Sequence, residues 1–100
     1  MRLSQTNIQR VQKYFKDQPV RKAYLFGSHS RAMADIDSDV DILVELDHST
    51  PVGLKFIRMQ FELESILKTK VDLLSDRAIS QYIRPYVDKD KELIYEKIYQ

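Results

Sequence analysis

Apolar and polar residues alternate along the first part of the chain with two periods, one typical of helices and one typical of strands. Helical spacing of apolar residues extends over about 7–16, and a capping box over 6–9 is expected at the start of this helix. Residues 20–27, VRKAYLFG, are rich in strand-forming side chains and end at a glycine. The pattern therefore predicts a helix, then a strand that runs into a tight turn.

A second strand is indicated by the alternation in residues 39–46, DVDILVEL. One face of this strand is apolar, whereas the other face carries Asp39 and Asp41. Beyond it, apolar residues return to helical spacing, which predicts a longer helix that begins at Pro51 and ends near 68–70.

The remaining elements are shorter. Ser28 is expected to cap a helix of two turns, and residues 70–76, KVDLLSD, read as a short strand in which Asp72 faces away from the apolar side. A last helix is expected over 79–87, and 92–96 forms either an edge strand or the final helical turns. This order predicts an α/β (α+β) fold, with a small mixed sheet flanked by helices.

Composition limits the classes of protein. The chain has 100 residues, 43% of them hydrophobic, which suffices for one small core and predicts a single domain over 1–100. Its net charge of +1 argues against direct binding to nucleic acid, and the lack of cysteine excludes disulfides and thiolate metal sites. Because no apolar run is long enough for a membrane span, a cytoplasmic protein without membrane contact is expected.

The acidic strand is a candidate metal site. Carboxylates at positions i and i+2 of a strand share one face and lie roughly 6 to 7 Å apart at the backbone. Asp39 and Asp41 have this spacing, and Mg²⁺ would neutralise their repulsion. Asp72 from another strand would extend the site to two ions. The alternative is a strand face that is merely solvated.

A second feature lies upstream. The sequence YLFGS brings a strand to Gly27 and then to a helix start at Ser28, where free backbone N–H groups can bind an anion. One short helix connects this phosphate cradle to Asp39, so a cradle and a metal site are expected side by side.

These motifs resemble a known family. Gly27-Ser28, ten further residues and Asp39-Val40-Asp41 reproduce the Gly-Ser-x(10)-Asp-x-Asp signature of nucleotidyltransferases with the DNA polymerase beta-like fold. The stretches FGSHSRAMADIDSDVDILVEL and KVDLLS are closer still to the minimal nucleotidyltransferases, the MNT family. Two positions depart from the family pattern, namely Ser30 in place of Ala and Ala32 in place of Gly.

The resemblance implies a minimal nucleotidyltransferase domain that acts as the antitoxin of a type VII HEPN/MNT toxin–antitoxin system. Such a protein would bind its cognate HEPN RNase toxin and transfer AMP from ATP to a tyrosine of that toxin. Carried over, the family's residues are Gly27, Ser28 and Arg31 for the nucleotide, and Asp39, Asp41 and Asp72 for catalysis and for two Mg²⁺ ions.

Two other functions remain open from the sequence. The chain could neutralise its HEPN partner by binding alone, with a weak or inactive site, or it could transfer nucleotides to RNA or to a small molecule. The tyrosines of the C-terminal part also allow two interpretations, a surface for a partner or ordinary packing; they are Tyr82, Tyr86, Tyr95 and Tyr99.

Overall fold

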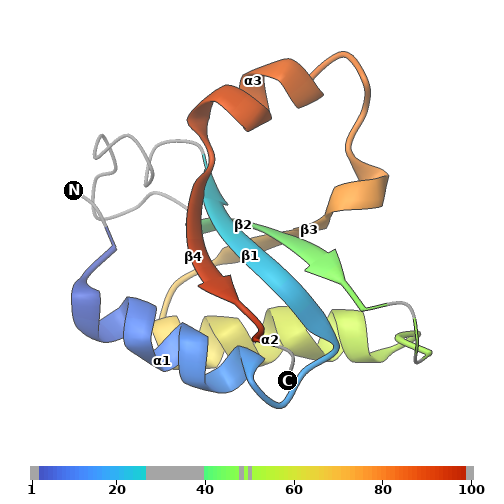
Figure 1. The fold of residues 1–100 in the computed structure, drawn as a ribbon. Helices are drawn as coiled ribbons and strands as arrows, with labels where there is room; N and C mark the ends of the chain where they lie inside the picture. The colour runs from blue at the N-terminus through green and yellow to red at the C-terminus, as the bar shows by residue number, and fades with distance from the viewer. Residues whose placement is uncertain (1–2, 27–39, 48, 50, 99–100) are drawn as a thin grey trace.

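The computed structural model describes residues 3–26, 40–47, 49 and 51–98. Figure 1 shows the elements of this part of the chain and labels the α-helices and the strands. In chain order they are α1 (Gln5–Phe15), β1 (Val20–Phe26), β2 (Val40–Leu46), α2 (Lys55–Leu67), β3 (Val71–Ser75), the 3₁₀ turn η1 (Asp76–Ala78), α3 (Arg84–Asp90) and β4 (Glu92–Glu96).

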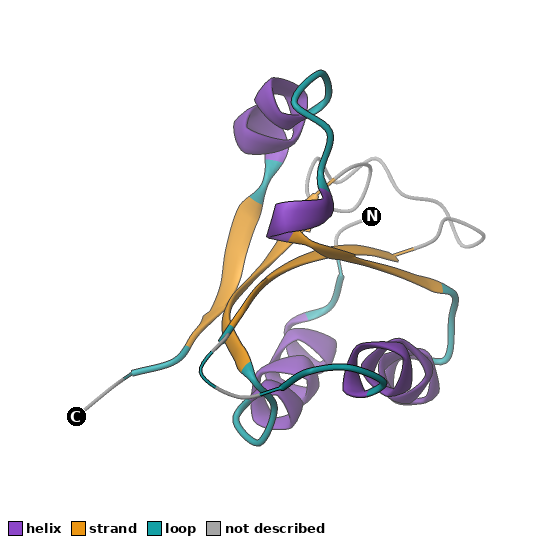
Figure 2. Cartoon of the chain, turned by 90° about the vertical axis from the view of Figure 1, so that its right-hand side faces the viewer, coloured by secondary structure: helices purple, strands orange, loops and turns teal. Residues whose placement is uncertain are grey.

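The strands form one mixed sheet in the order β3-β2-β1-β4. The pair β2–β3 is parallel, and the other two pairs are antiparallel. A parallel pair needs a long crossover connection, which α2 supplies here. Figure 2 shows α1 and α2 together on one face of the sheet, with η1 and α3 on the other. The expected mixed sheet flanked by helices is confirmed.

The main core lies between the sheet and the α1–α2 layer. Alternate strand residues point into it, as the period of two requires, and the apolar stripes of both helices meet them. Its fully buried members include Val11, Phe15, Ala23, Leu25, Ile42, Val44, Met59 and Leu63. Since α1 and α2 cover this face, the opposite face of β1, β2 and β3 is left for other contacts.

Both long helices begin at other residues than the sequence predicted. The capping box over 6–9 is wrong, because the Oγ of Ser4 accepts the backbone N–H of Asn7 at 3.2 Å and α1 begins at Gln5. The longer helix begins at Lys55, not at Pro51, after a turn in which Gly53 has φ +47°. Its predicted end is confirmed, since Lys68 adopts a left-handed conformation.

The C-terminal part differs most from the prediction. A helix is present in this part, but the bounds 79–87 are wrong, because Ile79 is extended and α3 begins only at Arg84. Ile79 and Val87 belong to one apolar cluster with Leu43. Both are apolar because of this shared contact, and not because they lie on one helix. Residues 92–96 resolve into a strand, β4, at the edge of the sheet. No helix among the described residues is long and apolar enough to cross a membrane.

Candidate active site

Two of the predicted carboxylates are neighbours on the sheet. In the parallel pair β2–β3, Asp41 and Asp72 are register partners. Neighbouring strands lie about 4.8 Å apart, and paired residues of parallel strands project to the same face. On its other side Asp41 is paired with Phe26, the last residue of β1. Asp41 and Asp72, the carboxylate pair, therefore lie at the end of the sheet where β1 finishes.

Both side chains point away from the main core. Asp41 stands between Val40 and Ile42, which are 1% and 0% exposed within that core. Asp72 stands in the same way between two buried core residues of β3 and is itself exposed. The alternation that the sequence showed thus places the carboxylate pair on the open face.

Several predicted site residues lie outside the described part of the chain. They are Gly27, Ser28, Arg31 and Asp39, together with the short helix expected from Ser28. Their chain neighbours are described, since Phe26 ends β1 and Val40 begins β2. The two described residues that flank 27–39, Phe26 and Val40, therefore both lie beside Asp41.

The carboxylate pair could contribute oxygen ligands to a hard divalent cation such as Mg²⁺. Two like charges about one strand spacing apart repel, and a hard divalent cation with oxygen ligands removes that repulsion. Within the described residues no group of three His, Cys, Asp or Glu side chains could hold a metal. The third expected ligand, Asp39, belongs to the part not described, so the metal site stays a prediction, and the structure gives only the register of Asp41 with Asp72.

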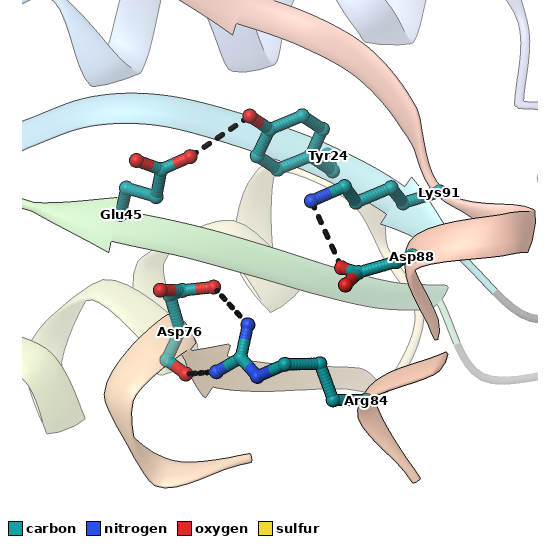
Figure 3. A network of polar contacts seen from close by, with 6 residues as sticks. All are labelled: Tyr24, Glu45, Asp76, Arg84, Asp88 and Lys91. Atoms are coloured by element: carbon teal, nitrogen blue, oxygen red, sulfur yellow. Dashed lines mark hydrogen bonds and ion pairs between the residues drawn. The ribbon is translucent and has the colours of Figure 1, made fainter. Parts of the chain in front are cut away.

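An independent small cluster fixes α3 above the open face. Leu43, two residues after Asp41, is fully buried and packs against Ile79 and Val87. Figure 3 shows Arg84 at the start of α3 reaching Asp76, whose Oδ1 accepts Nη1 of the arginine at 3.0 Å. The other guanidinium nitrogen, Nη2, donates to the backbone carbonyl of Asp76. These two contacts tie the start of α3 to η1, which directly follows β3.

Polar residues of β1, β2 and α3, with Lys91 between α3 and β4, complete the open face. The hydroxyl of Tyr24 donates to Oε2 of Glu45 at 2.8 Å, and burial, followed by this hydrogen bond, raises the pKa of Tyr24 to about 12. The Nζ of Lys91 lies 4.6 Å from the centre of the Tyr24 ring and 3.0 Å from Oδ1 of Asp88. The sequence did not indicate these residues, because the pairing of β1 with β2 and with β4 brings Glu45 and Lys91 to Tyr24.

The tyrosines of the C-terminal part divide between the two interpretations. Tyr95 is 8% exposed and packs in the main core, with its ring 5.7 Å from that of Phe15. Tyr82, just before α3, is 79% exposed, and Tyr86, within α3, is 73% exposed. Tyr99 lies outside the described residues.

The fold is that of the polymerase beta-like nucleotidyltransferases. A solved toxin–antitoxin structure with AMP-PNP matches with a TM-score of 0.73, at 24% identity, over 95% of this chain and 75% of that one. A complex of tri-AMPylated Shewanella oneidensis HEPN toxin with MNT antitoxin matches with a TM-score of 0.70, at 24% identity, over 95% and 74%. At this identity the likeness concerns the fold.

The sequence then places the chain within a family. It belongs to the polymerase beta nucleotidyltransferases, whose family model matches residues 9–100. Protein adenylyltransferase MntA of Thermococcus cleftensis is 40% identical over 76 residues, which are 76% of this chain and 74% of the relative. A Methanocaldococcus jannaschii relative, provisionally named a protein adenylyltransferase, is 36% identical over 92 residues, or 88% and 89% of the two chains. The predicted family and enzyme class, nucleotidyltransferase, are confirmed.

Proposed function

We propose that this chain is the antitoxin of a HEPN/MNT toxin–antitoxin pair and that it transfers AMP from ATP to a tyrosine of the HEPN RNase toxin. The observation that carries the proposal is the register of Asp41 and Asp72 at the end of β1. That position joins the carboxylates to the Gly27-Ser28 turn, which follows β1 in the sequence. The protein adenylyltransferase names of the relatives support the same reaction.

Access to the site supports a macromolecular acceptor. Because α1 and α2 cover the opposite face, the carboxylate pair is open to an acceptor hydroxyl on the face of the sheet where α3 lies. On that side Tyr82, Ile83 and Tyr86 are 79%, 48% and 73% exposed. Exposed apolar side chains gathered in this way are typical of a protein contact.

The residues divide the reaction among them. Gly27 and Ser28 hold the triphosphate through backbone N–H groups and the serine hydroxyl, and Arg31 contacts a phosphate. Asp39, Asp41 and Asp72 hold Mg²⁺, for which their oxygen atoms are suitable ligands. When bound, Mg²⁺ neutralises charge on the phosphates and lowers the pKa of a bound hydroxyl.

Asp72 also orients the acceptor and takes its proton. The tyrosine oxygen attacks the α-phosphorus of ATP, the bond from that phosphorus to the bridging oxygen breaks, and pyrophosphate leaves. The proton of the tyrosine hydroxyl passes to the Asp72 carboxylate, and AMP stays on the tyrosine. No covalent intermediate with this chain is needed.

Labelled ATP provides the test. The chain is incubated with Mg²⁺, ATP labelled at the α-phosphate and the HEPN protein encoded beside it, and the label on each protein is then measured. Label on a tyrosine of the HEPN protein is expected, together with loss of its RNase activity. An unlabelled HEPN protein that nevertheless binds the chain would contradict the enzymatic proposal.

A double variant separates transfer from mere binding. Asp41→Asn with Asp72→Asn keeps the side-chain shapes but removes both charges from the carboxylate pair. If this variant still binds the HEPN protein but no longer silences its RNase, transfer is the means of neutralisation. Full silencing by the variant would instead favour an antitoxin that acts by binding alone.

A further inference from the structure

Lys91 lies at the same end of the sheet as the carboxylate pair. It directly precedes Glu92, which is paired with Leu25 in the antiparallel pair β1–β4. This register brings Lys91 beside Phe26, the residue of β1 that is paired with Asp41. Two strand spacings, roughly 10 Å, therefore separate the backbones of Lys91 and Asp41.

The side chain of Lys91 extends over the open face. Its Nζ lies 4.6 Å from the centre of the Tyr24 ring and 3.0 Å from Oδ1 of Asp88. Figure 3 shows both Lys91 and Asp88 near the end where β1 finishes and β2 begins, while Glu45 lies toward the other end. The ammonium group is thus on the same side of the sheet as the carboxylate pair.

Two further cations, Arg84 and Lys22, are engaged farther away. Arg84 donates to Asp76, which follows the last residue of β3. Lys22 lies 3.6 Å from Glu96 and stands four residues before Phe26, a distance of about 13 Å along the strand. Lys91 is therefore nearer than Arg84 and Lys22 to a ligand at the carboxylate pair.

The contact that now holds Lys91 is easily exchanged. Its side chain is 26% exposed and that of Asp88 is 44% exposed, and ion pairs this open to water add little stability. A triphosphate carries several negative charges, and a lysine on a flexible stem can follow them as a point charge. Leaving pyrophosphate gains negative charge during transfer, so a cation at this place also stabilises the transition state.

We propose that Lys91 is a nucleotide-binding residue that exchanges Asp88 for the β- and γ-phosphate oxygens of ATP. The inference rests on the proposed function, because it assumes that ATP binds at the carboxylate pair. It adds a residue of the C-terminal segment to a site that the sequence motifs place wholly within 27–72.

Binding measurements on the whole chain test the inference. Calorimetry with Mg²⁺ compares three probes, namely ATP, inorganic pyrophosphate and AMP. Lys91→Met is expected to weaken ATP and pyrophosphate binding at least about tenfold, and to leave AMP binding within about twofold, since AMP lacks the β- and γ-phosphates. Lys91→Arg should keep most of the affinity for ATP.

The matched control is Lys89→Met, which removes the same charge from an exposed position of α3 and should change none of the three affinities. Wild-type ATP affinity in Lys91→Met would overturn the inference while leaving the proposed function intact. Equal weakening of AMP and ATP would also overturn it, because the effect would then not depend on the outer phosphates. A wild-type chain that binds no ATP would overturn both.

Discussion

Asp41 and Asp72 lie side by side on neighbouring parallel strands and project to the same face of the sheet. Each is flanked by core residues of its own strand. The two carboxylates gain this proximity from backbone pairing and not from flexible side chains. Their separation is therefore set before any ligand arrives, which suits a site that must hold a cation in one place.

Replacing either carboxylate is expected to abolish function without loss of the fold. Asp41→Asn or Asp72→Asn should lower AMP transfer at least about a hundredfold, because charge stabilisation at the phosphates is lost. The same variants should lose the rise in melting temperature that Mg²⁺ gives the wild-type chain, since ligand binding stabilises the folded state. Asp17→Asn, at an exposed position just after α1, is the control and should retain both properties.

Leu43 is expected to be the main apolar anchor of α3. The side chain is 0% exposed, so Leu43→Ala should lower the free energy of unfolding by about 2 to 5 kcal/mol. Leu93→Ala removes the same atoms from a side chain that is 48% exposed, and it should cost less than about 1 kcal/mol. Urea unfolding of the two variants checks the difference, and equal costs would show that α3 does not depend on Leu43.

The contacts between Arg84 and Asp76 are expected to matter locally more than globally. The two side chains are 37% and 34% exposed, so Arg84→Met should lower the free energy of unfolding only slightly. Because the guanidinium ties the start of α3 to η1, amide hydrogen exchange over 84–90 should become faster. Arg77→Met should not have this effect, and unchanged exchange in the Arg84 variant would argue that α3 is held by packing alone.

Two tyrosines are expected to make stability fall at high pH. Burial raises the pKa of both Tyr14 and Tyr24 to about 12, above the value of about 10 in an unfolded chain. A group whose pKa is raised on folding stabilises the folded state fully at a pH below its pKa in the unfolded chain. This stabilisation is lost as the pH rises from about 10 toward 12.

The slope of stability against pH gives the measurement. Urea unfolding below and above pH about 10 should show a decrease for the wild-type chain and a smaller decrease for Tyr24→Phe. Tyr82→Phe, at a position that is 79% exposed, should keep the wild-type slope. The slope is compared and not the absolute stability, because the Tyr24 variant also loses the hydrogen bond to Glu45. An unchanged slope in Tyr24→Phe would show that this hydroxyl is not protected on folding.

The sequence predicted those parts of the fold that depend on local periodicity. The apolar alternation of β2 and β3 placed Asp41 and Asp72 on the solvent side of their strands, as the structure has them. Helix boundaries were less accurate, because Ile79 has helical spacing to Val87 but is extended and meets it through Leu43.

The contacts that could not be predicted are those between segments distant in the sequence. Lys91 reaches the ring of Tyr24 only through the pairing of β4 with β1, and no spacing along the chain encodes that pairing. The roles expected for Gly27, Ser28 and Asp39 stay predictions, because these residues lie outside the described part of the chain.

The alternation of β2 also limits how the chain can change in length. Asp41 faces the site and Ile42 faces the core, so a single residue inserted just before Asp41 would exchange the two faces. The inserted residue would then lie beside Asp72, Asp41 would enter the hydrophobic core and Ile42 would turn to the open face. Substitutions on the open face can change which acceptor the site binds without disturbing the core. Insertions and deletions are tolerated only in the connections between strands.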